Sequence, residues 1–267
     1  IKIKDISGIS VTCGPGLVSS LMVGINFAKG LSLGLNIPLV GINHLEGHIV
    51  SSFINNENNI EYPFLSLLVS GGHTQIIYVK KNDYSIISKT VDDAAGEAFD
   101  KGAKILGLKY PGGPEIEKLA IYGSSSKFKF KVPVVKSNIK NFSFSGIKTA
   151  LLYLVRDMST KELEQELNNI AASYQKVIID TLFQKLQLCL EDNTIKKISI
   201  VGGVSANKYF RNRAKEFSSK NNYINIEFPD FKFCTDNAAM IAMAGYLKLK
   251  KNFNINENIN PNPNLNF

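Results

Sequence analysis

The sequence lacks tryptophan altogether and has only three cysteines in 267 residues, at Cys13, Cys189 and Cys234. Their number is odd and they lie far apart, so they fit neither a disulfide framework nor a Cys-x-x-Cys zinc pattern. This argues against a secreted protein held together by disulfides and favours a reducing compartment. Histidine is equally scarce, with three residues in the whole chain.

Long apolar runs are also lacking. No uninterrupted apolar run approaches the roughly 18 residues of a membrane span, and the first residues, Ile1-Lys-Ile-Lys-Asp5, do not resemble a secretory signal. The content of 44% hydrophobic and 20% charged residues is that of a globular protein. We therefore expect a cytoplasmic protein, or one of an organelle matrix if the source is eukaryotic, without a membrane partner. The missing initiator Met indicates a fragment or a processed form.

Acidic residues are absent from one long stretch. The net charge is +8, and between Lys118 and Arg156 there are eight basic residues and no Asp or Glu. Within this stretch, the residues from Lys127 to Lys131 alternate Lys and Phe with the period of a β-strand, which places the lysines on one face and the phenylalanines on the other. Two interpretations remain open: a solubilising face over a core strand, or a binding surface for a polyanion such as nucleic acid.

Strands and helices alternate towards both ends of the chain. We predict buried strands at 6–12, 38–42, 64–69 and 197–201, and mostly helices from 94 to 191. We expect a first lobe from residues 1–92 and 236–250, a second from 93–235 with a helical insertion and glycine-rich nucleotide-binding turns, and a disordered tail at 251–267. Two lobes whose strands end in glycine pairs favour a ligand cleft between them.

The pattern His44-Leu-Glu-Gly-His48 is the sharpest local signal. Two histidines four residues apart on a helix lie about 40° apart around its axis, so both imidazoles can reach one metal ion. Glu46 lies about 200° around the axis, unlike the general base of His-Glu-x-x-His metalloproteases, so peptidase chemistry is disfavoured. Such a pair needs a further ligand, usually a carboxylate. Asp236 is a candidate, but taken alone it is more typical of a helix N-cap.

Three glycine-rich turns can bring backbone N–H groups close to phosphate or sugar oxygens. They are Ser70-Gly-Gly-His73, Pro111-Gly-Gly-Pro114 and Gly202-Gly-Val-Ser-Ala-Asn207. The segment from Gly146 to Thr149 lacks the glycines of a P-loop, and we reject that interpretation. Asp92, Asp93 and Glu97 cluster at a predicted helix start, where the helix dipole alone explains them. Asp100 lies one turn further along, in a position to face the cleft.

Taken together, these motifs resemble the TsaD/Gcp family, the tRNA N6-adenosine threonylcarbamoyltransferases, in its bacterial or organellar form. The matching stretches occur in the family's order and cover nearly everything from residue 5 to 250. They are Val11-Thr-Cys-Gly-Pro-Gly-Leu17, Asn43-His-Leu-Glu-Gly-His48, Leu68-Val-Ser-Gly-Gly-His-Thr-Gln75, Asp92-Asp-Ala-Ala-Gly-Glu-Ala-Phe-Asp-Lys101, Tyr110-Pro-Gly-Gly-Pro114, Phe142-Ser-Phe-Ser-Gly-Ile-Lys-Thr149, Gly202-Gly-Val-Ser-Ala-Asn207 and Cys234-Thr-Asp-Asn-Ala-Ala-Met240.

The resemblance implies an α/β fold of the two-lobed actin/sugar-kinase/Hsp70-like class, with a first lobe that lacks the family's N-terminal strands. It implies one divalent metal ion, iron(II) or zinc, held by His44, His48 and Asp236, with Ser70 near or on the metal. The substrate-binding residues that it implies are Leu68, Val69, Ser70, Gly71, Gly72, Asp100, Gly113 and Asn207. No catalytic general base is assigned.

The implied reaction transfers a threonylcarbamoyl group from threonylcarbamoyl-adenylate to N6 of adenosine 37 in tRNAs that read ANN codons, and releases AMP. The implied partners are tRNA and companion proteins of the TsaB and TsaE type. Three alternatives stay open: a kinase- or chaperone-like ATPase of the same fold class, a metallopeptidase, and a non-catalytic scaffold. The ATPase would not require the histidine pair.

Overall fold

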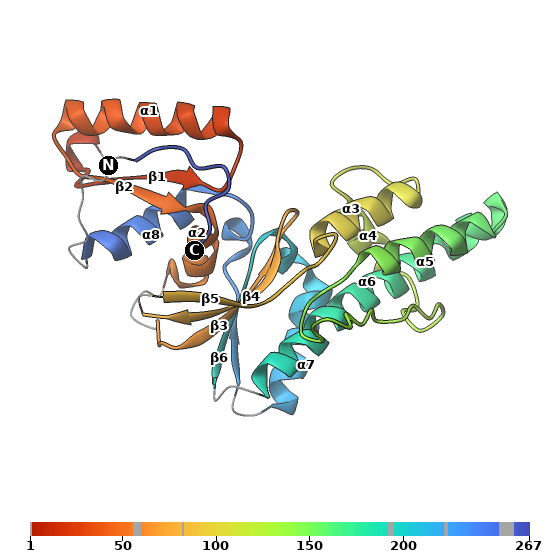
Figure 1. The fold of residues 1–267 in the computed structure, drawn as a ribbon. Coiled ribbons are helices and arrows are strands. Elements are labelled where there is room, and N and C mark those ends of the chain that lie inside the picture. The colour runs from red at the N-terminus through yellow and green to blue at the C-terminus, as the bar shows by residue number, and fades with distance from the viewer. Residues whose placement is uncertain (1, 56–59, 82, 192–194, 222–223, 251–258) are drawn as a thin grey trace. The chain divides into compact units, whose positions relative to one another are not determined.

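The computed structural model of the chain describes residues 2–55, 60–81, 83–191, 195–221, 224–250 and 259–267. These residues form two compact units (Figure 1). Unit 1 comprises Ile1–Ile60 and Pro229–Phe267, and unit 2 comprises Glu61–Phe228. Each unit combines helices with a β-sheet, so the predicted α/β class is confirmed.

Unit 1 is built on a parallel pair of strands, β1 (Ile9–Gly14) and β2 (Leu39–Asn43). Parallel neighbours need a crossover connection, and here α1 (Val18–Leu35) provides it and ends at Asn36, which adopts the left-handed conformation that stops helices. Helix α8 (Ala238–Lys250) packs against β1 and β2 on the face opposite α1 (Figure 1). Helix α2 (His44–Val50) follows β2 without an intervening loop. Short 3-10 helices complete the unit at Ile3–Asp5, Ser51–Phe53 and Phe231–Phe233.

Helix α1 has an apolar side that the rest of unit 1 leaves uncovered. Leu21, Ile25 and Ala28 are buried, whereas Val23 and Phe27 are 72% and 73% exposed. By length and composition alone α1 could cross a membrane, although its apolar residues are interrupted by Ser, Asn and Lys. Among the described residues it is the one helix that meets this criterion.

Unit 2 contains a five-stranded sheet in the order β5-β4-β3-β6-β7. Strand β4 (Thr74–Lys80) pairs antiparallel with β3 (Phe64–Val69) on one side and with β5 (Asp83–Lys89) on the other. Strands β6 (Lys197–Val201) and β7 (Asn225–Glu227) continue the sheet in parallel from β3. β3 and β6 are buried along their whole length, which explains why both are nearly continuous apolar runs.

The helices of unit 2 share one core with this sheet. Leu65, Leu67 and Val69 of β3 belong to the same buried cluster as the inner sides of the helices. These helices are α3 (Ala95–Ile105), α4 (Gly112–Ala120), α5 (Ser145–Arg156), α6 (Thr160–Leu190) and α7 (Lys208–Lys220), with a short 3-10 helix, η4, at Gly203–Ala206.

The two units do not follow the predicted lobe boundaries. Residues 61–92, predicted for the first lobe, lie in unit 2, because β3 pairs in parallel with β6. Residues 229–235, predicted for the second lobe, lie in unit 1. Residues 251–258 of the predicted disordered tail lie outside the described residues. Residues 259–267 are ordered: Ile259 is buried, and the Asn262 N–H donates to the Cys13 carbonyl at 2.8 Å.

The Lys127–Lys131 segment, whose alternation has the period of a strand, pairs with no neighbour in the described sheet. The predicted alternation of its side chains is nevertheless present. Phe128 and Phe130 pack on the core of unit 2, and the lysines between and beside them are exposed. Alternation of apolar and charged side chains over a core therefore does not by itself make a strand, which also needs pairing with a neighbour.

Candidate functional site

The histidine pair lies at the start of α2 in unit 1. The Asn43 side chain caps this helix, since its Oδ1 accepts a hydrogen bond from the Leu45 N–H at 2.9 Å. His44 and His48 are one turn apart, and their ring centroids lie 4.9 Å from each other. The predicted geometry, with both imidazoles on one face of a helix, is present.

Asp236 meets both rings from a position 188 residues beyond His48. Its Oδ1 lies 3.3 Å from His44 Nε2 and 3.1 Å from His48 Nε2, and the three potential ligand atoms lie within 4.8 Å of one another. Capping of α8 falls to the next residue, Asn237, whose Oδ1 accepts from the Met240 N–H at 2.9 Å. The alternative role of Asp236 as an N-cap is therefore wrong, and its carboxylate is available as a ligand.

The electrostatics of this triad suit a cation. Hydrogen bonds from His44 and His48 hold the pKa of Asp236 well below its ordinary value, against the opposing effect of burial. The His48 side chain is 3% exposed and that of Asp236 is 77% exposed, so the triad has a buried wall and an open side. His48 Nδ1 is buried without a hydrogen-bond partner among the described residues. Two imidazoles and a carboxylate form a donor set that suits iron(II) or zinc.

Glu46 takes no part in the triad. Its Oε2 forms an ion pair with Lys248 Nζ of α8 at 2.9 Å, and its side chain is largely buried. The predicted orientation of Glu46 away from the histidine pair agrees with this pairing. A carboxylate so engaged is poorly placed to activate a water molecule at the triad, so the arrangement does not fit a His-Glu-x-x-His metallopeptidase.

An open pocket of about 430 Å³ adjoins the triad within unit 1. His44 and Asp236 line it together with Ser10, Val11 and Thr12 of β1 and with the first residues of α8. The exposed side of the triad therefore faces a space large enough for part of a small-molecule substrate.

In unit 2, the turn between β3 and β4 is closed by its own end residues. The Ser70 N–H donates to the His73 carbonyl at 2.8 Å, and the His73 N–H donates to Ser70 Oγ at 3.1 Å. Gly71 and Gly72 between them are exposed, and a Cβ on either would meet no atom within 4 Å. The backbone of these two glycines is therefore accessible to a ligand, as the glycine-rich sequence predicts.

Helix α3 begins directly against this turn. The Gly96 N–H donates to the Ser70 carbonyl at 3.2 Å, and a Cβ at Gly96 would lie 2.6 Å from that oxygen. The Ala95 N–H donates to Thr74 Oγ1 at 2.8 Å. Glycine at position 96 thus permits the first turn of α3 to contact the backbone of the Ser70–His73 turn.

Asp100 and Asn207, both predicted to bind substrate, are each engaged within unit 2. Asp100 Oδ1 accepts from the Gly112 N–H at 2.7 Å and so fixes the start of α4, beside Gly113. Asn207 is buried; its Oδ1 caps α7 at 2.8 Å from the Phe210 nitrogen, and its Nδ2 donates to Gln175 Oε1 at 2.7 Å. Leu68 and Val69 are fully buried, so only their backbone groups are candidates for contact with a substrate.

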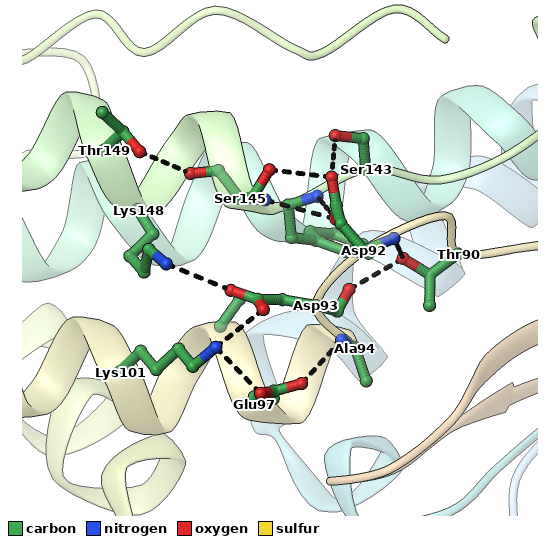
Figure 2. Close-up of polar contacts among 12 residues, drawn as sticks. Thr90, Asp92, Asp93, Ala94, Glu97, Lys101, Ser143, Ser145, Lys148 and Thr149 are labelled. Carbon is green, nitrogen blue, oxygen red and sulfur yellow. Dashed lines mark hydrogen bonds and ion pairs between the residues drawn. The ribbon is translucent and has the colours of Figure 1, made fainter.

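Asp92, the first residue of the acidic cluster, serves a different helix from the predicted one. Asp92 lies just before α3, but its carboxylate accepts four hydrogen bonds from the start of α5 (Figure 2). The donors are the Ser143 hydroxyl, the Phe144 N–H, and both the hydroxyl and the N–H of Ser145. Burial raises the pKa of Asp92, but these hydrogen bonds outweigh it and leave the pKa below its ordinary value.

Asp93 and Glu97 stabilise the start of α3 through lysines. Lys101 Nζ lies 2.7 Å from Asp93 Oδ1 and 2.8 Å from Glu97 Oε1, and Lys148 Nζ of α5 lies 3.6 Å from Asp93 Oδ2 (Figure 2). Nothing in the sequence signalled that residues about fifty positions apart, Asp92 with Ser143 and Asp93 with Lys148, would join α3 to α5.

Comparison with known proteins identifies the family. A model of the TsaD family, described as tRNA N6-adenosine threonylcarbamoyltransferase, matches residues 1–243. A protein with that name from Thermosipho melanesiensis is 50% identical over 246 residues, which are 92% of this chain and 74% of the relative. One from Christiangramia forsetii is 50% identical over 260 residues, covering 94% of this chain and 75% of the relative. The chain thus spans about three quarters of the length of these relatives.

Two solved structures of HypF resemble the chain in fold. The full-length HypF structure in its phosphate- and nucleotide-bound form has a TM-score of 0.68 and 13% identity, and the match covers 92% of this chain and 39% of HypF. The HypF structure from T. kodakarensis has the same TM-score, 14% identity, and a match that covers 91% of this chain and 40% of that protein. This likeness is in the fold alone, and it agrees with the two-lobed actin-like class that the sequence predicts.

Proposed function

This chain belongs to the family of tRNA N6-adenosine threonylcarbamoyltransferases, and from that premise we propose that His44, His48 and Asp236 hold the family's divalent metal ion. The observation that carries the proposal is the convergence of both Nε2 atoms on one carboxylate oxygen, at 3.3 and 3.1 Å. The donor set suits iron(II) or zinc, and which of the two is bound depends largely on availability.

The reaction transfers a threonylcarbamoyl group to N6 of an adenosine in tRNA. A metal ion bound by the triad would act as a Lewis acid that polarises the donor, a contribution of several kcal/mol. The protein's own residues would position the reactants: in unit 2, the backbone N–H groups of Gly71 and Gly72 would hold the adenylate phosphate that leaves. Asp100 and Asn207 would fix the surrounding backbone, beside Gly113, because their hydrogen bonds order the starts of α4 and α7.

For the tRNA substrate, the acid-free segment supplies candidate phosphate contacts. Lys129, Lys131 and Lys136 are exposed, whereas Lys127 is paired with Glu166 at 2.5 Å. A segment that packs its phenylalanines on the core and exposes its lysines suits a polyanion. Binding by these lysines would weaken steeply as the salt concentration rises, and an affinity for tRNA that is independent of salt would exclude the role.

We assign the exposed side of α1 to the binding of a companion protein of the TsaB type, and not to contact with a membrane. Large apolar side chains there stand uncovered within unit 1, and exposed apolar patches commonly mark sites of protein association. A protein of the TsaE type is a further expected partner. The compartment that we assign is the cytoplasm, or the organelle matrix if the source is eukaryotic, because the tRNA substrate must be present there.

The decisive experiment removes the two imidazoles. In the double variant His44→Ala/His48→Ala, we expect loss of bound metal, measured by elemental analysis, and a fall in threonylcarbamoyl transfer of about 100-fold or more. The assay should supply tRNA and preformed threonylcarbamoyl-adenylate, so that the supply of donor by companion proteins does not limit the rate.

Glu46→Gln is the matched control on the same helix. It removes a carboxylate that is paired with Lys248, and we expect it to retain the metal and most of the transfer activity. Full transfer by a metal-free double variant would refute the proposal. Peptide cleavage that disappears in Glu46→Gln would instead favour the metallopeptidase alternative.

A further inference from the structure

The last described segment of the chain, residues 259–267, forms an ordered strap along unit 1. Ile259 at its start is 8% exposed and packs in a small core with Leu21 and Ile25 of α1. From there the strap passes the end of β1, where the Asn262 N–H donates to the Cys13 carbonyl at 2.8 Å. A segment that is Asn- and Pro-rich is thus held by an apolar anchor and by backbone hydrogen bonds.

The far end of the strap reaches the metal triad's own helix. The carbonyl of Pro263 accepts from the Gly16 N–H at 3.2 Å, and the carbonyl of Asn266 accepts from Asn43 Nδ2 at 3.3 Å. Asn43 immediately precedes His44. The strap therefore ends at the residue that caps α2.

The end of β1 leaves room for the strap. A Cβ at Gly14 would lie 1.9 Å from the Asn262 carbonyl oxygen and 2.8 Å from Leu265 Cβ. The strap thus occupies the space that any side chain at position 14 would fill. Gly16, two residues on, has nearly the same φ, 158° against 155°, but a Cβ there would meet only Leu21 side-chain atoms at 3.6 Å or more.

Asn43 connects the strap to α2 because its two side-chain atoms have separate tasks. Oδ1 caps the helix through the Leu45 N–H, and Nδ2 donates to the strap. Asn43 is nearly buried, so its hydrogen bond to the strap is sheltered from competing water. A helix of seven residues depends on such end contacts for its direction, and that direction sets where the His44 and His48 rings point.

We propose that the C-terminal strap, residues 259–267, is a positioning element of the metal centre, which acts through Asn43 to hold His44 and His48 in line with Asp236. This inference rests on the proposed function, since it assumes that the triad binds a metal ion. Groups that orient metal ligands from outside typically contribute 10- to 100-fold to metal affinity.

The test measures the affinity for Zn(II) by competition with a chromophoric chelator, and the visible absorption spectrum of the Co(II)-loaded protein. Deletion of residues 259–267 should weaken Zn(II) binding by about tenfold and change the Co(II) spectrum, which reports the arrangement of the ligands. Asn43→Ser should do the same, because serine keeps the capping oxygen but is too short to reach the strap. Gly14→Ala should also weaken binding, and Gly16→Ala, its matched control, should do so much less.

The combination of deletion with Asn43→Ser separates the possible outcomes. If the strap acts through Asn43, the combined variant should bind Zn(II) as tightly as whichever of the two single variants has the lower affinity. A loss of affinity in the combined variant equal to the product of the two single losses would show that the strap does not act through Asn43. Asn43→Ser could instead keep the wild-type Zn(II) affinity and Co(II) spectrum while Asn43→Ala loses affinity. That result would assign the effect to capping alone and overturn the strap's role. If the deletion variant does not fold, the point variants decide. A wild-type protein that binds no metal would overturn the proposed function itself, a result distinct from all of these.

Discussion

At the scale of single residues, Asp92 shows how one carboxylate can join two helices. It lies in the segment before α3 and accepts four hydrogen bonds from residues at the start of α5 (Figure 2). Its pKa is below the ordinary value of 3.8. A group whose pKa is lowered by folding contributes stability above its unfolded-state pKa, and the contribution is lost as the pH falls through the folded-state value.

Asp92→Asn should therefore destabilise the protein at neutral pH and not in acid. We expect a loss of about 1 kcal/mol in the free energy of unfolding at pH 7, since the site is partly open to solvent and its charge is screened. The difference from wild type should begin to shrink as the pH falls below about 4, where the carboxyl of the unfolded chain takes up a proton, and should vanish below the lower pKa of the folded state. Urea unfolding at a series of pH values measures both quantities.

Asp83→Asn is the control, because Asp83 is exposed and forms an ion pair with the equally exposed Lys80 at 3.7 Å. It should change stability little at either pH. A loss in Asp92→Asn that stays constant down to pH 3 would show that the charge of Asp92 is not the cause.

At the scale of elements, the start of α3 packs so closely against the Ser70–His73 turn that the contact limits which residue can stand at position 96. Gly96 and Gly146 are both the second residue of a helix, α3 and α5 respectively. A Cβ at Gly96 would lie 2.6 Å from the Ser70 oxygen and 2.9 Å from Gly71 Cα, whereas a Cβ at Gly146 would meet nothing within 4 Å. Helix propensity alone predicts that alanine stabilises both positions.

Gly96→Ala and Gly146→Ala should consequently have opposite effects. We expect Gly96→Ala to lower the free energy of unfolding by about 1–3 kcal/mol, because backbone atoms must move to admit the methyl group. Gly146→Ala should leave it unchanged or raise it by up to about 1 kcal/mol. Chemical denaturation of the two variants side by side provides the comparison, and equal stabilisation of both would mean that α3 does not begin in contact with the turn.

At the scale of the whole molecule, the least expected surface is the outer side of α1. Val23 and Phe27 are each more than 70% exposed, on a helix whose other side forms the core of unit 1 with Leu21 and Ile25. Isolated exposed apolar residues are ordinary, but several on one helix indicate a partner.

Phe27→Glu should weaken association with a companion protein of the TsaB type by at least about tenfold without unfolding unit 1, because Phe27 is not in its core. Analytical ultracentrifugation or calorimetry with the purified companion measures the affinity. Tyr122→Glu, at an exposed position of unit 2, should leave the affinity unchanged. An affinity for the companion protein that is unchanged in Phe27→Glu would contradict the assignment of a protein partner. So would a wild-type protein that binds lipid vesicles and loses that binding in Phe27→Glu.

The sequence by itself determined what depends on neighbours within a few positions. The geometry of His44 and His48, the cap at Asn43, the buried strands at 64–69 and 197–201 and the glycine-rich turns all follow from helical or strand periodicity and from backbone freedom, which are local. The family and its α/β fold also followed, because the motifs stand in a specific order.

Only the tertiary structure decided which distant segments meet. It brought Asp236 to the histidines, directed Asp92 to α5, placed residues 61–92 in the sheet of unit 2, and ordered residues 259–267 against β1 and Asn43. These contacts join residues from about fifty to more than two hundred positions apart. A local pattern carries no information on such pairings, because they depend on how strands pair and how buried surfaces fit together.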